Sequence, residues 1–444
     1  MTSRTHLAAL GVALTLAGAA LAPTSALAAP ATPSAPPVTQ PVTQPESGRV
    51  TTGATTLDVQ GKGRTPFTYQ GSGYGTSVTG GQVPVGSGRT GLTRVSCTSQ
   101  TGKSNRNYVA EAELPGAGTV DAVSSKVVTR RKGTRFETFA KHKVASVVLA
   151  DTPLGSLSVS GVVAVAKAFH TPKGFGTYTN TKIAGITFTP PVGDPQVIPI
   201  PTPGQPVTIP GLATLTLGRG IEKHSQHDGR AFAVALVVKV IPTETVVKVG
   251  RSVAKITDGY KTGIFHGSSF PAKASVLGDI VKVGRVINRV MPCAGTDGQL
   301  QVEKAADVNI GDQVKVGAAE AKQIGRQNRQ RATGREASQV AGVDIGGQLQ
   351  VEAIKSYAKM TRYRSGKSNR NAGMSVGGIT LGGQEISLDQ LKQGIEIPGL
   401  AKVQADIRKK VGGGIKVIGL RITLLDGTGA VVDLATSQIR IDSK

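Results

Sequence analysis

The stretch FAVALVVKV, residues Phe232 to Val240, decides the fold class of this chain. Large apolar residues at every second position alternate with smaller or charged ones, which is the period of a β-strand with one buried face. The segment IGLRITL, Ile418 to Leu424, repeats the pattern. The turn signals Asp228-Gly229 and Gly412-Gly413-Gly414 precede the two stretches and predict hairpin tips. We therefore expect an all-β chain built of antiparallel sheets.

The composition agrees with many short strands and turns. Of 444 residues 58 are glycine, 39% are hydrophobic and 4% are aromatic, with no tryptophan. This balance excludes wholesale disorder and a multi-span membrane protein. The most apolar run, Ala231 to Val238, is far shorter than the roughly 20 residues of a membrane helix, so we expect no transmembrane segment in the mature chain. A short helix is expected only at Ser387 to Gln393, capped by Ser387 or Asp389.

The two halves of the chain resemble each other. The pentapeptide IPGLA occurs at Ile209 to Ala213 and again at Ile397 to Ala401, and GSLSV at Gly155 to Val159 matches GQLQV at Gly347 to Val351. Ordered matches separated by about 190 residues predict a tandem duplication. We expect two sandwich-like β domains, at 67–260 and 261–444, each with a formal charge of +11.

The N-terminal residues have the pattern of an export signal. Arg4 precedes an apolar run, and Ala26-Leu27-Ala28 is a small-x-small cleavage site, so residues 1–28 are expected to be a signal peptide. Residues 29–66 are rich in Pro and Thr, and the tetrapeptide PVTQ occurs twice within Pro37 to Gln44. Such a segment is typical of an extended, solvated spacer. We therefore expect a secreted, extracellular protein.

Several of these features resemble one family of secreted actinobacterial proteins. They are the leader, the spacer, the GSGYG entry at Gly71 to Gly75, the early Cys97 and the doubled unit with MPCAGT at Met291 to Thr296. Together they resemble the choice-of-anchor P family, over about Tyr69 to Ile441. The resemblance implies a surface protein with no assigned catalytic or binding residues. This chain has no C-terminal anchor motif, so non-covalent association with the cell wall is expected.

The two cysteines occupy equivalent positions in the two predicted domains. In an exported chain, Cys97 and Cys293 predict one disulfide between the domains. The alternative is a pair of buried free thiols.

Catalytic and metal-binding patterns are weak. His224, His227 and Asp228 resemble a metal-ligand cluster, but they lie at a predicted hairpin tip, so a solvated turn is expected. Glu111 and Glu113 share one face of a strand by simple alternation. We expect no enzyme, no metal and no cofactor. The alternative is an uncharacterised secreted hydrolase whose site lies in the first unit around His224, His227 and Asp228. No partner is visible for the remaining mature histidines, His142, His170 and His266.

Basic residues cluster at predicted hairpin tips. The formal net charge is +24, from 52 basic and 28 acidic residues. The hexapeptide GKSNRN occurs at Gly102 to Asn107 and at Gly366 to Asn371, out of register with the duplication. The candidate polyanion-binding residues are Arg130, Arg131, Lys132, Arg135, Arg326, Arg329, Arg331, Arg335, Arg362, Arg364, Lys367 and Arg370.

Clustered cations attract polyanions through long-range fields and counterion release. Outside a bacterium the available polyanions are teichoic acid, extracellular DNA and anionic lipid. The alternative is that the basic loops only aid solubility. The shortage of aromatic residues argues against a dedicated nucleic-acid ligand and against a lectin, because both use exposed aromatic faces. We therefore expect a non-enzymatic surface or matrix protein that adheres through charge; protein partners are unspecified.

Overall fold

The computed structural model describes residues 63–80, 89–114, 117–275, 285–287, 289–306, 308–310, 314–425, 427 and 429–443. The predicted signal peptide, and all but the last few residues of the predicted spacer, lie outside these ranges. Almost every described element is a strand, and all strand pairing is antiparallel, so the predicted all-β fold is confirmed. In the described part of the chain, no helix has the length and apolar character needed to cross a membrane.

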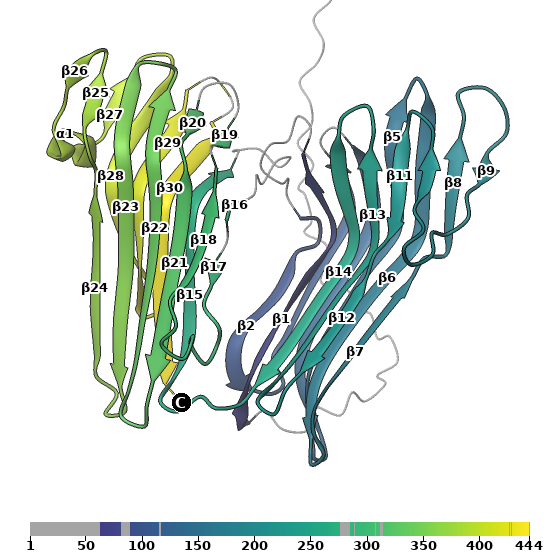
Figure 1. Cartoon of the computed structure of the whole chain (residues 1–444), viewed down its shortest axis with the longest axis horizontal. Helices are drawn as coiled ribbons and strands as arrows, with labels where there is room; N and C mark the ends of the chain where they lie inside the picture. Colours follow the sequence, from purple (N-terminus) through teal and green to yellow (C-terminus); the bar gives the residue numbers. More distant parts are fainter. Residues whose placement is uncertain are drawn as a thin grey trace, which may run out of the picture. The chain divides into compact units, whose positions relative to one another are not determined.

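The first β unit consists of two seven-stranded sheets (Figure 1). The β14 sheet has the order β10-β11-β13-β14-β1-β2, with β12 beside β13. The β5 sheet has the order β3-β4-β5-β6-β8-β9, with β7 beside β6. The strands are β1 (Arg64–Thr79), β2 (Thr93–Gln100), β3 (Ser104–Leu114), β4 (Gly118–Lys132), β5 (Arg135–Thr152), β6 (Gly155–Thr171), β7 (Gly174–Lys182), β8 (Gly185–Thr189), β9 (Gln196–Val197), β10 (Val207–Ile209), β11 (Ala213–Leu217), β12 (Gly220–His224), β13 (Asp228–Val240) and β14 (Thr245–Thr257).

The second β unit has a seven-stranded and a nine-stranded sheet (Figure 1). The β30 sheet has the order β16-β15-β30-β29-β28-β27, with β17 beside β15, and the β22 sheet has the order β18-β21-β22-β23-β25-β26. The elements are β15 (Gly263–Ser275), β16 (Arg285–Val286), β17 (Arg289–Val290), β18 (Gln301–Ala305), β19 (Val308–Ile310), β20 (Val314–Val316), β21 (Ala319–Gln327), β22 (Arg331–Ile345), β23 (Leu349–Tyr363), β24 (Ser368–Ser375), β25 (Ile379–Leu381), β26 (Gln384–Glu385), α1 (Leu388–Gln393), β27 (Ile395–Ile397), β28 (Ala401–Val411), β29 (Gly414–Leu424) and β30 (Val431–Ser443).

The two units pair their strands in the same way. In each, the first strand lies beside the last one, as β1 lies beside β14 and β15 beside β30. In each, the second sheet is a run of consecutive hairpins, with β5 between β4 and β6 and β22 between β21 and β23. The shared order agrees with the internal sequence similarity, and the tandem duplication stays a prediction.

The inner faces of the sheets form the cores. The first core has large aliphatic side chains from both sheets, such as Leu157 on β6 and Leu236 on β13. One end of the same sandwich is filled instead by small residues, including Ala166 and Ala231, around Phe67 and Tyr69. The second core is built alike from β22, β23, β29 and β30. A short helix, α1, begins after Ser387, whose hydroxyl accepts a hydrogen bond from the Gln390 backbone N–H in a capping box.

A line of irregular pairs crosses the sheets and reverses which residues face the core. In the β5 sheet the line runs through Ala122 and Gly161, whose φ angles are 47° and 61°. In the β14 sheet it runs through Gly250, with φ 64°, opposite Ala235. Bulge-like irregularities of this kind re-aim side chains.

The expectation that Phe232 and Val234 share a buried face with Leu236 is therefore wrong. Ala231 and Leu236 both belong to the inner clusters, although they are five residues apart. Phe232 lies on the opposite side, where its ring is 5.1 Å from the guanidinium carbon of Arg251. The alternation is real within each half of the strand, but its phase changes at Ala235.

Candidate functional site

The two cysteines form the predicted disulfide. Cys97 lies in β2 and Cys293 follows β17, and their Cα atoms are 5.4 Å apart. Cys97 and Cys293 are buried in a small apolar cluster with Tyr260 and Ile264. The Tyr260 hydroxyl donates a hydrogen bond to the carbonyl oxygen of Thr65 at 2.5 Å. The Cys97–Cys293 disulfide thus joins residues of the two β units, and the alternative of free thiols is wrong.

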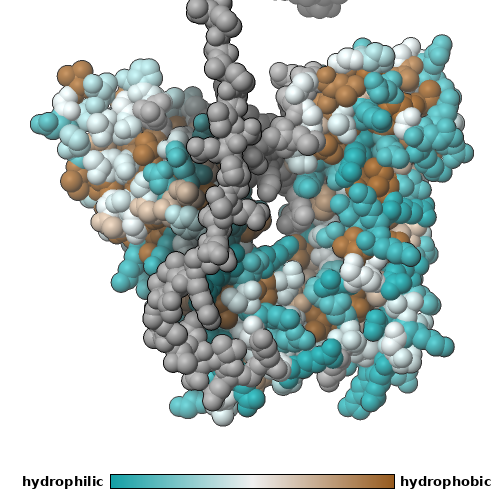
Figure 2. Space-filling model, turned by 180° about the vertical axis from the view of Figure 1, so that it is seen from behind, coloured by the Kyte–Doolittle hydropathy of each residue, from teal (hydrophilic) through white to brown (hydrophobic). Residues whose placement is uncertain are grey.

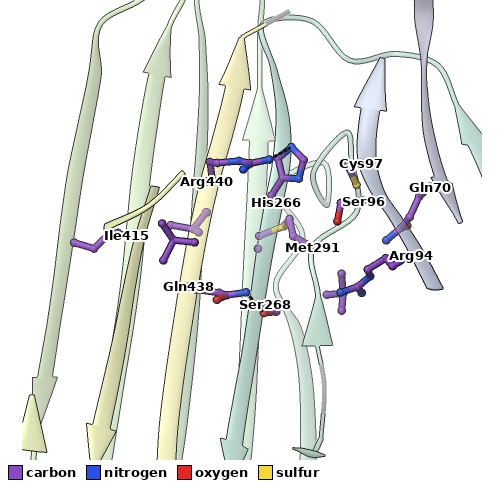
Figure 3. Close-up of a pocket in the computed structure, with 14 residues that line it drawn as sticks. Gln70, Arg94, Ser96, Cys97, His266, Ser268, Met291, Ile415, Gln438 and Arg440 are labelled. Atoms are coloured by element: carbon purple, nitrogen blue, oxygen red, sulfur yellow. Dashed lines mark hydrogen bonds between the residues drawn. The ribbon is translucent and has the colours of Figure 1, made fainter. Parts of the chain in front are cut away.

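A small pocket lies beside the disulfide (Figure 3). Its volume is about 180 Å³, and its polar lining includes Arg94, Gln438 and Arg440. Figure 3 shows Arg440 next to His266. Their nitrogens are 3.2 Å apart. Both side chains also contact Asp442. Burial by itself would raise the pKa of the Asp442 carboxyl, but the hydrogen bond from His266 and the nearby positive charges lower it below its ordinary value. The carboxylate balances this group of cations.

The first predicted basic tip is a hairpin, as expected, but its charge is partly neutralised. Arg130, Arg131 and the exposed Lys132 are the last residues of β4, and Arg135 begins β5 after the turn at Gly133. Arg130 forms an ion pair with Glu137, and Arg135 Nη2 lies 2.9 Å from the other oxygen of that carboxylate. The Glu137 side chain is only 5% exposed beneath them. The sequence did not mark Glu137, because it faces Arg130 only through the pairing of β4 with β5.

The other two predicted clusters come together at one end of the second unit. The β21–β22 tip carries Arg329 and the β23–β24 tip carries Arg364, and the Arg364 backbone N–H donates to the Gln330 carbonyl oxygen at 2.8 Å. Arg370 Nε donates to the Gly413 carbonyl oxygen at 2.6 Å, which adds the β28–β29 tip. We call the exposed cations of these tips the second-unit basic end. They are Arg329, Arg331, Arg364, Lys367, Arg370, Lys409 and Lys410.

The second-unit basic end has little compensating charge. Within the described ranges, none of its seven cations forms an ion pair with a carboxylate. Figure 2 shows hydrophilic side chains projecting at the lower end of this unit. The remaining predicted residues lie on the strands that lead to these tips. Arg326 is exposed on β21, Arg335 lies over the Tyr357 ring at 5.2 Å, and Arg362 is half-buried with a buried Nε.

The hexapeptide GKSNRN has the same local role in both places. Gly102 and Gly366 both lie in turns with positive φ, 77° and 90°. In each copy the residues from the serine onward begin a strand, β3 or β24, that pairs with one neighbour. A glycine is favoured there because only it adopts positive φ without strain. The hexapeptide thus recurs where the two turns share the same backbone geometry, and not at equivalent positions of the two β units.

A further cationic patch was not predicted. Arg94, Arg251 and Lys255 lie on the outer side of the β14 sheet. Burial, followed by repulsion from Arg230 and Arg251, lowers the pKa of Lys255 to about 8. Burial and nearby arginines also lower the pKa of Arg94 and Arg251. The strands that hold these residues are far apart in sequence, so only their pairing reveals the cluster.

The histidines do not form a metal site within the part of the chain that the structure describes. His227 has a side chain 78% exposed and contacts Asp258 at 3.2 Å, while Asp228 bonds to Ser225 within the turn. The three histidines without a visible partner in the sequence all have one. His142 contacts Ser252, His266 contacts Asp442, and His170 lies against Phe67 with ring centroids 4.5 Å apart.

Comparisons with known proteins identify no family. No family model matches the chain, and no curated protein matches it. Among solved structures, the chain has a weak likeness to the CymD monoaromatic hydrocarbon channel, with 9% identity and a TM-score of 0.12 over 87% of this chain and 90% of that one. A likeness at this level carries no argument about fold or function.

Proposed function

We propose that this chain is a non-enzymatic, exported surface or matrix protein that adheres to anionic envelope polymers. The leader-like N-terminus and the disulfide support export, since disulfides persist in oxidising compartments. The second-unit basic end is the proposed contact surface. The observation that carries the proposal is the hydrogen bond between Arg364 and Gln330, because it joins two cationic segments separated in sequence.

The ligand class follows from the geometry. Cations on hairpin tips present charge without a deep pocket, and such a surface suits an extended polymer of phosphates more than a small substrate. Counterion release on neutralising several phosphates supplies affinity that falls steeply with salt. Wall teichoic acid is therefore the preferred ligand, with extracellular DNA and anionic lipid as competing polyanions.

The test uses binding of the full chain to immobilised teichoic acid at several salt concentrations. The variant Arg329→Gln/Arg364→Gln/Lys367→Gln removes three cations of the basic end. The matched control, Lys239→Gln/Lys248→Gln/Lys402→Gln, removes three exposed lysines on strands elsewhere. We expect the first variant to lose more affinity and to depend less on salt than the control, because its removed charges are the ones that contact phosphates. Equal losses in the two variants would show that only net charge matters and would refute the proposed site.

A further inference from the structure

The outer face of the β5 sheet combines cations with aromatic rings, against the expectation from composition. Strand register places Phe139, Lys167 and Tyr178 in one row across β5, β6 and β7. The next row along the strands holds Arg106, Lys126 and Lys141. The row after it holds Tyr108, Lys143 and Lys182, and Phe169 lies on the other side of the first row. These side chains alternate with core residues such as Ala140 and Ala166, so they point away from the core.

The rings on this face contact cations. The guanidinium carbon of Arg135 is 3.7 Å from the centroid of the Phe169 ring, and that of Arg130 is 4.6 Å from the Phe139 ring. Lys167 Nζ is 4.5 Å from the Tyr178 ring. The contacts hold the planar guanidinium groups and the rings close together on the face.

The central charge on the face is uncompensated. Within the described residues, Lys126, Lys141 and Lys143 form no ion pair, and Glu137 is occupied by two arginines. Burial, followed by repulsion from Arg106, Arg130 and Lys141, lowers the pKa of Lys126. Binding of an anion between these neighbouring cations is favourable, because it reduces their mutual repulsion.

The cationic zone on the outer face of the β5 sheet ends at acidic residues, and its tyrosine rings are exposed. The acidic residues Glu111, Glu113 and Asp121 lie beyond the irregular pair at Ala122, so they mark where the cationic zone ends. Among the described elements, those packed on the β5 sheet belong to the β14 sheet and cover its inner side. Tyr108 and Tyr178 are 66% and 41% exposed.

We propose that the outer face of the β5 sheet binds single-stranded nucleic acid, with bases stacked on Tyr108, Phe139 and Tyr178. The phosphates are held by Lys126, Lys141 and Lys143. Cations alone would suit any polyanion. Aromatic side chains and guanidinium planes interleaved with cations match a strand that alternates flat bases with phosphates. A sheet face is a suitable platform because its side chains stand in regular rows. The surface and the contacts differ from those of the second-unit basic end.

The first test is fluorescence anisotropy of a labelled oligothymidylate with the full chain. Tyr108→Leu/Tyr178→Leu removes two exposed rings, and we expect binding to weaken at least about tenfold, the effect typical of losing stacked bases. Tyr178→Phe keeps the ring and should keep the affinity. Both tyrosines are exposed, so the substitutions leave the core intact, which thermal unfolding checks. Unchanged oligothymidylate binding by Tyr108→Leu/Tyr178→Leu would overturn the proposal.

The second test separates stacking from charge. Lys141→Gln/Lys143→Gln should weaken oligothymidylate binding and reduce the slope of log affinity against log salt by about 1.4, at about 0.7 for each lost phosphate contact. Inorganic polyphosphate carries phosphates without bases, so the lysine variant should weaken its binding and the tyrosine variant should not. A tyrosine variant that weakens both polymers equally would contradict base stacking.

The third test separates this site from the proposed adhesion surface. Both assays are repeated in the Arg329→Gln/Arg364→Gln/Lys367→Gln background. The tyrosine effect on oligothymidylate should persist there, while teichoic acid binding is already reduced. If the background variant alone abolishes oligothymidylate binding, the second-unit basic end is the nucleic-acid site and the proposal for the β5 sheet fails.

Discussion

Replacement of His142 by asparagine tests the electrostatics of the first core. The imidazole is fully buried on β5, and its Nδ1 lies 2.7 Å from the Ser252 hydroxyl. That hydroxyl donates its hydrogen to the Ala164 carbonyl oxygen at 2.8 Å. Ser252 must therefore accept from His142, which places the proton of the neutral ring on Nδ1. Nε2 has no hydrogen-bond partner among the described residues.

Protonation of Nε2 would create a buried charge with an unpaired N–H. Burial, and to a smaller extent the charge of Arg251, lowers the pKa of His142 from 6.5 to about 3. Between these values the unfolded chain binds a proton that the folded chain does not, so stability falls as the pH falls. From pH 7 to pH 4 this one group should cost about 3 kcal/mol of the free energy of unfolding.

The variant His142→Asn keeps a donor for Ser252 and cannot be protonated. It should be less stable than the wild type at pH 7, because the smaller side chain leaves a cavity. At pH 4 the difference between the two proteins should shift by about 3 kcal/mol in favour of the variant. Urea unfolding followed by circular dichroism at both pH values measures this shift. The exposed His227→Asn is the control. A wild-type-to-variant difference that is the same at both pH values would refute the reasoning.

Three further perturbations test other parts of the fold. Cys97→Ser/Cys293→Ser opens a loop whose ends are 196 residues apart, and the chain-entropy model predicts a loss of about 5 kcal/mol in urea unfolding; an unchanged midpoint would contradict it. Glu336 is fully buried, and this burial raises its pKa well above the ordinary value, although Ser269 and the charge of Arg289 act in the opposite direction. The protonated Glu336 carboxyl stabilises the folded state, and this stability is lost as the pH rises. Glu336→Gln should therefore raise the melting temperature above that of the wild type at pH 8 and not at pH 4. Equal shifts in melting temperature at the two pH values would contradict this reasoning. Arg421 holds the buried Asp433 through two hydrogen bonds of 2.7 and 3.0 Å. Arg421→Met should lower the free energy of unfolding by about 3 kcal/mol, because it leaves the Asp433 carboxylate buried and unpaired, and adding Asp433→Asn should recover part of that loss. An Arg421→Met variant as stable as the wild type would contradict this role of the pair.

Local pattern was enough for the fold class, whereas the disulfide was predicted from the similarity between the two halves, with free thiols as the alternative. Alternation with period two at Phe232 to Val240 identified strands, since a strand buries one face whatever its neighbours are. Glycine turns identified hairpin tips such as Gly412-Gly413. The equivalent places of Cys97 and Cys293 predicted their bond.

The same reasoning failed where two strands must be known together. The change of face at Ala235 depends on Gly250 lying opposite it, where the regular pairing of β13 with β14 is interrupted, and the partner of His142 lies on β14. Glu137 neutralises Arg130 only because they are opposite each other in the β4–β5 hairpin.

The sequence by itself determined that this chain forms β-sheets, where its turns fall and how strongly basic it is, because those properties depend on residues close together along the chain. Only the tertiary structure decided which cations and rings become neighbours. Phe139, Lys167 and Tyr178 share a row because the register of three strands aligns them, although nothing in their spacing along the chain marks them as a set. Register is fixed by the packing of the opposite, buried face, so the composition of the outer face emerges only once the core has formed.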